Sequence, residues 1–167
     1  MNFVEKVRRN HGIEHATVHV LSEANPNLSV VGRADGGGFA IIGDVDPETL
    51  LSAALEALRR MQNGQSALAV HPRCGTMLVT MGALTAVAAF LALGRKPKLS
   101  RLPDAILATT LAAFVAQPAG LALQKYVTTS PNVQAARVVG VTRKNFAGME
   151  FWHVDIEWTG ETSSALE

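Results

Sequence analysis

Two long uncharged runs in the middle of the chain restrict its folds more than any other feature of the sequence. The first, "TMLVTMGALTAVAAFLALG", extends from Thr76 to Gly94. At about 1.5 Å of rise per residue, a helix of this length nearly matches the hydrocarbon thickness of a bilayer. The second run, from Ala105 to Gln124, follows the short basic stretch "RKPKLSR". The two runs predict a hairpin of membrane-spanning helices, and the alternative is a pair of Ala-rich helices buried in a soluble protein.

Length, charge and cysteine content further restrict the class of protein and its compartment. With 167 residues and a formal net charge of +1, the chain has the length of one domain and lacks the basic excess of nucleic-acid-binding proteins. Cys74 is the single cysteine, so no intramolecular disulfide can form and a reducing compartment is the simplest expectation. The N-terminal stretch "MNFVEKVRRNHGIEH" is charged throughout, which argues against a cleaved secretion signal. We expect a lipid bilayer as a partner and no nucleic acid.

The N-terminal part has the patterns of a small α+β region. Residues 2–22 suit a helix, because apolar residues and histidines recur there at spacings of three and four. Residues 27–45 predict two short strands around a triple-glycine turn, since the Lys-Ser/Thr of a phosphate-binding loop is missing. Asp46 and Pro47 then supply the N-cap and first turn of a second helix, which stops at Asn63.

Two more strands are predicted near the C-terminus, over "AARVVGVTRKN" and "FWHVDIEW". In the second, four apolar residues alternate with His153, Asp155 and Glu157, which gives one buried and one solvent-facing side. On this pattern His153 belongs to the solvent-facing side. Residues 159–167 are expected to form a frayed tail.

The predicted fold class is therefore α+β, with a small helix-and-hairpin extramembrane domain and a two-helix transmembrane hairpin. We divide the chain into an N-terminal α/β region (1–70), the transmembrane hairpin with the preceding "HPRCGT" (71–127), and C-terminal strands that pack with the N-terminal region (128–160). Because a hairpin of two spans returns the chain to the side that it left, "HPRCGT" is expected beside "QKYVTTSPN", residues 124–132. The helix at 2–22 can reach the same membrane face.

The stretch "HGIEH" in the first helix is the main candidate for chemistry. His11 and His15 are four residues apart, so their Cβ atoms are expected about 5 to 6 Å apart on one helix face, where both rings can bind one ion. Glu14 lies on the same side, and H-x-x-E-H is the order found in inverzincins, where two histidines bind zinc and the glutamate is the general base. Gly12 costs about 1 kcal/mol relative to alanine inside a helix, which suggests close approach of another group.

A zinc site needs a third protein ligand, and "HPRC" offers His71 and Cys74. Either would complete a site with an open position for water, whereas both together with His11 and His15 would close the shell and make the site structural. A nucleophilic Cys74 paired with His71 is a third alternative. His19 lies about 12 Å along the helix axis from His11 and is expected to be a packing residue. Burial of all these groups as hydrogen-bonded polar residues remains the alternative without a metal.

The segments "HGIEHATVH", "HPRCGT" and "PAGLALQKYVTTSP" resemble, in the same order, motifs of the YqhQ-like family of bacterial membrane proteins. The chain also resembles a shorter, related group of uncharacterised proteins. The YqhQ-like family is described as a predicted metal-dependent enzyme of unknown substrate, so the resemblance implies a metal and a membrane. The matching positions are His11, Gly12, Glu14, His15, His71, Pro72, Arg73, Cys74, Gly75, Thr76, Gln124, Thr128 and Thr129. Ala16 departs from the usual lysine and Met77 from the usual serine, and Ser130 with Pro131 replaces an acidic ending.

Together these features predict a membrane-associated, metal-dependent hydrolase, with zinc or another divalent transition metal as cofactor. The predicted site residues are His11, His15, His71 and Cys74 as metal ligands, and Glu14, Arg73, Thr128 and Thr129 as catalytic residues. Glu14 takes the proton from water, Arg73 or a threonine hydroxyl stabilises an oxyanion, and the threonines orient ligands. A peptide or lipid-linked substrate, with a peptidase-like reaction, fits a membrane surface. The alternative is a non-enzymatic membrane scaffold or assembly protein with a closed structural zinc site.

The expected location is a bacterial inner membrane, with the metal site facing the cytoplasm. The basic loop between the runs would be cytoplasmic by the positive-inside tendency and argues for the opposite orientation; its charges are Arg95, Lys96, Lys98 and Arg101. Against it stands the translocation of the long N-terminal region without a signal sequence, which is unfavourable. Small residues in both runs allow close helix approach, so a homo-oligomer is compatible with the sequence.

Overall fold

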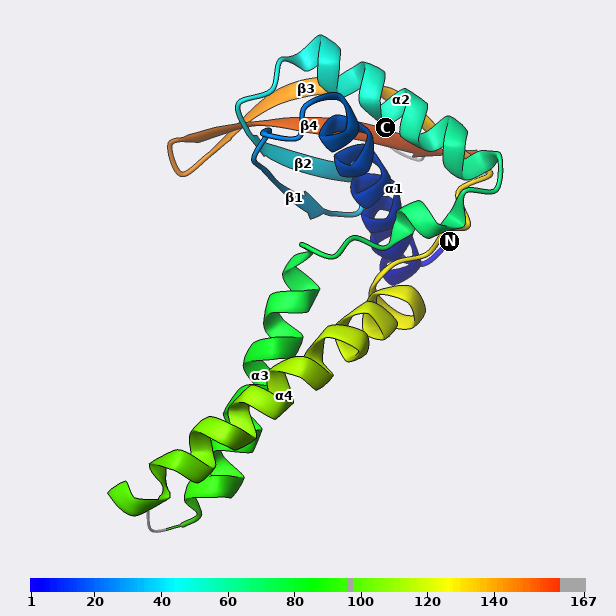
Figure 1. The fold of residues 1–167 in the computed structure, drawn as a ribbon. Coiled ribbons are helices and arrows are strands. Elements are labelled where there is room, and N and C mark those ends of the chain that lie inside the picture. Colours follow the sequence, from blue (N-terminus) through cyan, green and yellow to red (C-terminus); the bar gives the residue numbers. More distant parts are fainter. Residues whose placement is uncertain (96–97, 160–167) are drawn as a thin grey trace. The chain divides into compact units, whose positions relative to one another are not determined.

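The computed structural model describes residues 1–95 and 98–159, and within them it has the predicted α+β architecture (Figure 1). Contacts along the chain divide it into two units. Residues 1–71 and the C-terminal part from Val127 form the first, which we call the sheet unit. Pro72–Tyr126 form the second, the hairpin unit. Lys96 of the predicted basic loop and the predicted tail beyond Thr159 lie outside the described residues.

In the sheet unit, two helices cover a four-stranded antiparallel sheet (Figure 1). Helix α1 packs on β1 and β2, helix α2 packs on β3 and β4, and the two helices contact each other. The elements are α1 (Phe3–Ala24), β1 (Val30–Ala34), β2 (Gly38–Gly43), α2 (Pro47–Gln62), a 3-10 helix η1 (Ser66–Ala69), β3 (Ala136–Phe146) and β4 (Met149–Trp158). The core between helices and sheet includes the fully buried Ile13, Phe39 and Leu50.

Local capping explains where both helices begin. The Asn2 side chain accepts a hydrogen bond from the Glu5 amide at 2.8 Å, and Asp46 accepts one from the Thr49 amide at 2.9 Å. Each bond satisfies a backbone donor that has no partner inside the helix. The predicted helix at 2–22 and the predicted helix that begins after Asp46 and stops at Asn63 are confirmed as α1 and α2.

The sheet joins two hairpins that are distant in the sequence. Its strand order is β1-β2-β4-β3, and Gly38 and Ile41 of β2 lie opposite Asp155 and Trp152 of β4. The triple glycine forms the predicted turn between β1 and β2. At its end Gly38 has a φ of 153°, and a side chain there would overlap the carbonyl of Val154. Glycine at this position therefore allows β2 to pair closely with β4.

The predicted position of His153 on the solvent-facing side of β4 is wrong, because the residue is only 2% exposed. Its Nδ1 lies 2.7 Å from an Asp155 carboxylate oxygen, and its Nε2 lies 3.0 Å from an oxygen of Asp35 in the β1–β2 turn. Burial tends to raise the pKa of Asp35, but hydrogen bonds from the Gly37 amide and from His153 outweigh it, so this pKa lies below its ordinary value of 3.8. The two carboxylates therefore make burial of the imidazole tolerable.

The hairpin unit consists mainly of helices α3 (Gly75–Leu93) and α4 (Leu102–Leu123), which pack along each other (Figure 1). The 3-10 turn Leu99–Arg101 precedes α4, and the π-helical turn Gln124–Thr128 follows it. At one crossing the helices come very close, because a side chain on Gly120 would overlap Met77. Small residues thus serve the contact between the two helices of the hairpin.

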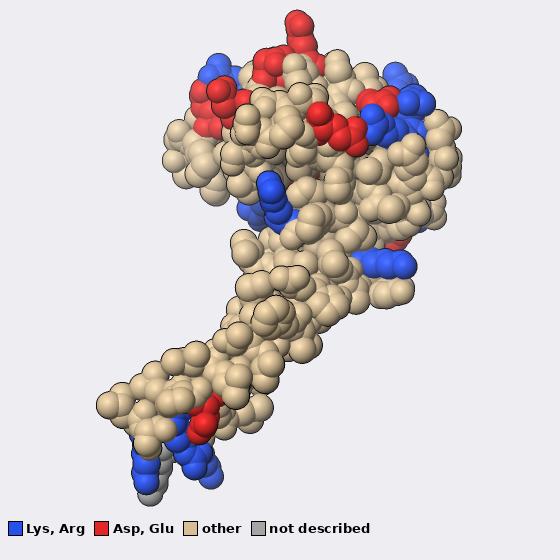
Figure 2. Space-filling view, viewed as in Figure 1, with Lys and Arg blue, Asp and Glu red and all other residues tan. Residues whose placement is uncertain are grey.

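Segments Gly75–Leu93 and Leu99–Thr128 are long and apolar enough to cross a membrane, which fits membrane association. Large apolar side chains of these helices point outward: Leu78 is 72% exposed and Phe114 is 70% exposed. On the face shown in Figure 2, the length of the hairpin between its two ends carries no charged side chain. Helices buried in a soluble core would cover such side chains, so the exposure favours the membrane interpretation over the soluble alternative.

Candidate metal centre

Four histidines of the sheet unit lie next to one another along α1. His11, His15 and His19 follow at one-turn intervals on the helix, and His71 comes from the segment after η1. The ring centroids are 4.3 Å apart for His11 and His15, and 4.7 Å apart for His19 and His71. Those of His15 and His71 are 6.0 Å apart. We call this group the histidine row.

Each α1 histidine of the row has one ring nitrogen within hydrogen-bond distance of a backbone carbonyl oxygen. His11 Nδ1 lies 2.9 Å from the Thr128 oxygen, and His15 Nδ1 lies 2.8 Å from the Ala69 oxygen. His19 Nε2 lies 3.0 Å from the Val70 oxygen. A carbonyl can only accept, so these ring nitrogens carry the hydrogen. In the neutral ring, the lone pair then sits on Nε2 of His11 and His15 and on Nδ1 of His19. Metal-binding histidines are typically oriented by such hydrogen bonds.

The carbonyl of Thr128 reaches His11 because its segment lies directly against α1. The Ser130 amide donates to the Arg8 carbonyl at 3.0 Å, and an Arg8 guanidinium nitrogen donates to the Thr129 carbonyl at 3.2 Å. A Cβ on Gly12 would lie 2.5 Å from the Ser130 oxygen. The close approach predicted at Gly12 is therefore confirmed, and the approaching group is backbone.

Thr128 and Thr129 contact α1 through their backbone carbonyls. Thr128 fixes the ring of His11, and Thr129, which is 1% exposed, binds the Arg8 side chain. This geometry allows the segment to orient a ligand. The use of their hydroxyl groups in catalysis stays a prediction.

Glu14 is 6% exposed and lies between α1 and strand β1. Its carboxylate rests on Gly32, where any side chain would overlap it. The isolated glycine inside a predicted strand is a sequence signal for this contact, because such glycines often permit close approach of another group. The role of Glu14 as general base stays a prediction.

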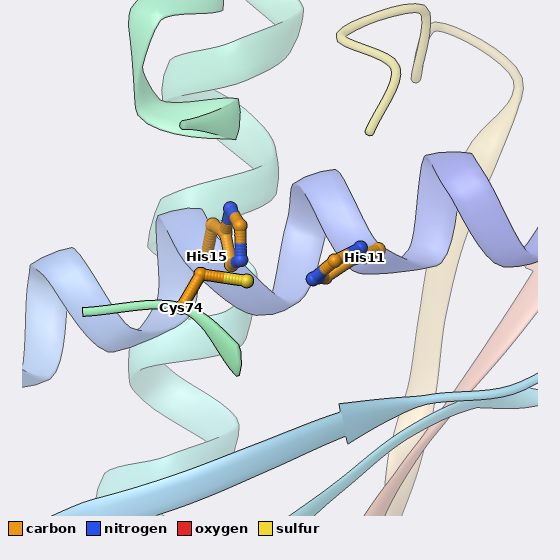
Figure 3. A group of neighbouring side chains, drawn as sticks. All are labelled: His11, His15 and Cys74. Atoms are coloured by element: carbon orange, nitrogen blue, oxygen red, sulfur yellow. The ribbon is translucent and has the colours of Figure 1, made fainter. Parts of the chain in front are cut away.

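Arg73 and Cys74 belong to the hairpin unit, in the short connection between His71 and α3. Cys74 is the N-cap of α3, where its sulfur accepts a hydrogen bond from the Thr76 amide at 3.4 Å. A helix N-terminus favours the thiolate form that binds metals. Only three peptide units separate Cys74 from His71, so the chain limits their Cα atoms to about 11 Å. Among the described residues, His11, His15 and Cys74 are of the residue types that can hold a metal ion (Figure 3).

Residues 6–141, from α1 into β3, match a family described as a domain of unknown function (DUF6391). An uncharacterized protein of Picosynechococcus sp. is 33% identical over 135 residues, which cover 74% of this chain and 66% of that protein. The chain thus spans just under two thirds of the length of this relative. No solved structure matches the chain. The similarity to YqhQ-like proteins stays a prediction.

Proposed function

Since the chain belongs to the DUF6391 family, whose match includes the whole histidine row, we propose that it is a membrane-associated, metal-dependent hydrolase. One observation carries the proposal: His11 and His15 each donate one ring N–H to a backbone carbonyl. Two imidazoles, one helical turn apart and held in the same tautomer, are suited to bind one divalent ion through Nε2.

The donor set fits zinc or a similar transition metal. Neutral imidazole nitrogens and a thiolate are ligands that zinc prefers. We propose His11 and His15 as two ligands and Cys74 as the third. Cys74 is tethered to His71 by a short stretch of chain, and its N-cap position favours the thiolate form. His71 is the alternative third ligand. With three protein ligands, one position stays open for water.

The reaction proposed is hydrolysis of a peptide or of a lipid-linked substrate at a membrane surface. When bound, the metal lowers the pKa of water and polarises the bond to be cleaved. Glu14 accepts the proton of the attacking water and returns it to the leaving group. Arg73, with a hydroxyl of Thr128 or Thr129, stabilises the negative charge that develops on the substrate oxygen.

We propose an inner-membrane location, in which α3 and α4 cross the bilayer and the sheet unit faces the cytoplasm. The exposed apolar side chains of the hairpin unit support the crossing.

A second candidate function is a membrane scaffold with a closed structural zinc site. It is favoured by the His71 ring, which lies 6.0 Å from that of His15 and is close in the chain to Cys74. If His11, His15, His71 and Cys74 all bind one ion, no position remains for water.

Metal content tests the proposal. Wild type, His11→Asn and Cys74→Ala are purified in detergent without chelator, and zinc per chain is measured by elemental mass spectrometry. An asparagine amide can still donate to the Thr128 carbonyl, so His11→Asn removes the ligand nitrogen while keeping the hydrogen bond. We expect metal in wild type and loss of the ion in His11→Asn. A wild type that binds no metal, even after incubation with zinc, contradicts the proposal.

Two further measurements separate the enzyme from the scaffold. An open site binds a hydroxamate inhibitor and a closed site does not, so hydroxamate binding to the zinc-loaded protein supports the hydrolase. Glu14→Gln is expected to keep the metal and lose activity. Under the scaffold alternative, the same variant keeps both the metal and the cellular role.

A further inference from the structure

We propose that His19 and His71 form a second metal-binding position, next to the one at His11 and His15. This inference goes beyond the proposed function, which uses one ion, and makes the histidine row a two-ion centre. It assigns a ligand role to His19, for which the sequence predicts only packing.

Ring separations divide the four histidines into two pairs. With a zinc–nitrogen distance of about 2.0 to 2.1 Å, two imidazoles on one tetrahedral ion have ring centroids about 5 Å apart. The separation of 4.7 Å for His19–His71 is close to this value, and that of 4.3 Å for His11–His15 lies somewhat below it. The 6.0 Å between His15 and His71 is larger than either. By ring separation, His11 is thus paired with His15, and His19 with His71.

The His19 ring is oriented as a ligand would be. Its Nε2–H donates to the Val70 carbonyl at 3.0 Å, so Nδ1 carries the lone pair. The ring of His71 meets it edge to face, at an interplanar angle of 69°. Metal-binding histidines typically have such a hydrogen bond on the ring nitrogen that does not bind the ion.

His71 is held opposite His19 by the two residues that precede it. The carbonyl of Ala69 accepts from His15, and the carbonyl of Val70 accepts from His19. These bonds attach the η1 segment to α1 at two successive turns, and the next residue is His71 itself. The His19 ring and the backbone next to His71 are therefore fixed by hydrogen bonds that do not involve Nδ1 of His19.

The chemistry of this second position differs from that of the first. It has two histidines and no thiolate, and both are only partly buried, so water can supply the remaining ligands. We infer weaker, more exchangeable binding than at His11 and His15. An ion with exchangeable water ligands is suited to bind an anionic oxygen of the substrate.

Zinc stoichiometry tests the inference. The full chain in detergent, without an affinity tag, is dialysed to equilibrium against a series of buffered free zinc concentrations, and zinc per chain is measured. We expect two successive steps, each of one ion. His19→Gln keeps a donor to the Val70 carbonyl but removes the ligand nitrogen, so it should lose the weaker step only. His71→Asn is expected to lose the same step, and His11→Asn the tighter one.

The outcomes separate this inference from the proposed function. A single ion in wild type that both His19→Gln and His71→Asn retain overturns the second position and leaves the proposed function intact. A single ion lost in His19→Gln but kept in His11→Asn supports this position and overturns the proposed one. Thermal unfolding of each metal-free variant, compared with metal-free wild type, identifies any variant that loses zinc through misfolding, and the other variant of that pair then decides.

Discussion

Large apolar side chains are buried in the sheet unit but exposed in the hairpin unit. In the sheet unit, large apolar residues such as Phe39 and Ile13 are fully buried, and the buried His153 has a carboxylate on each nitrogen. In the hairpin unit, Phe90 and Phe114 are 69% and 70% exposed. The hydroxyls of Thr80 and Thr109 bond to carbonyls four residues earlier in their own helices, at 2.8 and 2.9 Å. Such internal satisfaction is what a helix in lipid requires.

This difference fits a chain with one unit in water and the other in lipid. In water, burial of apolar area stabilises the sheet unit, and polar groups need partners only where they are buried. In lipid, exposure of apolar side chains costs no free energy. Close packing at small residues, such as that of Gly120 against Met77, stabilises a helix pair there instead. Substitutions of the same type in each unit should therefore have different effects.

The largest difference is expected when arginine replaces an exposed phenylalanine in each unit. Phe114→Arg places a charge near the middle of α4, which disfavours membrane insertion by about 2.5 to 3.5 kcal/mol. Phe146→Arg is the control, because Phe146 is 75% exposed at the end of β3. The share of protein that resists alkaline extraction from membranes measures both. Equal extraction of the two variants contradicts a hairpin in lipid.

A smaller difference is expected between two helical glycines. Gly12→Ala places a methyl against the Ser130 carbonyl, so backbone must shift, and we expect a loss of about 1 to 3 kcal/mol in unfolding free energy. Zinc affinity should fall as well, because the Thr128 carbonyl that orients His11 moves with the segment. Thermal unfolding and zinc titration measure these effects.

Gly82→Ala is the matched control, since nothing lies within 4 Å of a Cβ at Gly82 in α3. There the gain in helix propensity, about 1 kcal/mol, is unopposed. If Gly12→Ala behaves like Gly82→Ala in both measurements, the segment after α4 does not press against α1.

The smallest effect is expected from the pH dependence of the sheet unit. The pKa of Asp35 is lower in the folded state than its ordinary value of 3.8, so the folded state binds this proton less readily than the unfolded state. The resulting stability is present above pH 3.8 and is lost as the pH falls through the folded-state pKa. Asp35→Asn should therefore flatten the acid side of the stability curve in urea unfolding at several pH values. An unchanged slope below pH 4 contradicts this.

The sequence predicts elements whose cause is local. The cap at Asp46, the triple-glycine turn and the uncharged runs are each encoded by neighbouring residues, and the structure contains all of them. The close approach at Gly12 is also predicted by the sequence, because a glycine interrupts a helix pattern there. The sequence does not identify the approaching group, because Ser130 lies far along the chain.

Contacts between residues that are far apart in the chain could not be predicted from sequence patterns. The alternation in β4 assigns His153 to solvent, but Asp35 covers it from 118 residues away. His19 lies too far along α1 from His11 for both to bind the same ion. The sequence does not show that His71, from another segment, lies beside His19. Period and spacing describe one element at a time, and these contacts are made when separate elements pack.

The hydrogen bond between His11 and the Thr128 carbonyl has a consequence for biosynthesis. Its partners are 117 residues apart, so the helix with the histidines leaves the ribosome long before Thr128 is made. Both hydrophobic helices are translated in between. The ring of His11 can therefore reach its final orientation only after the hairpin has been produced. Under the proposed function, metal loading would therefore follow synthesis of the hairpin, and a chain stalled before Thr128 would present an unfinished site.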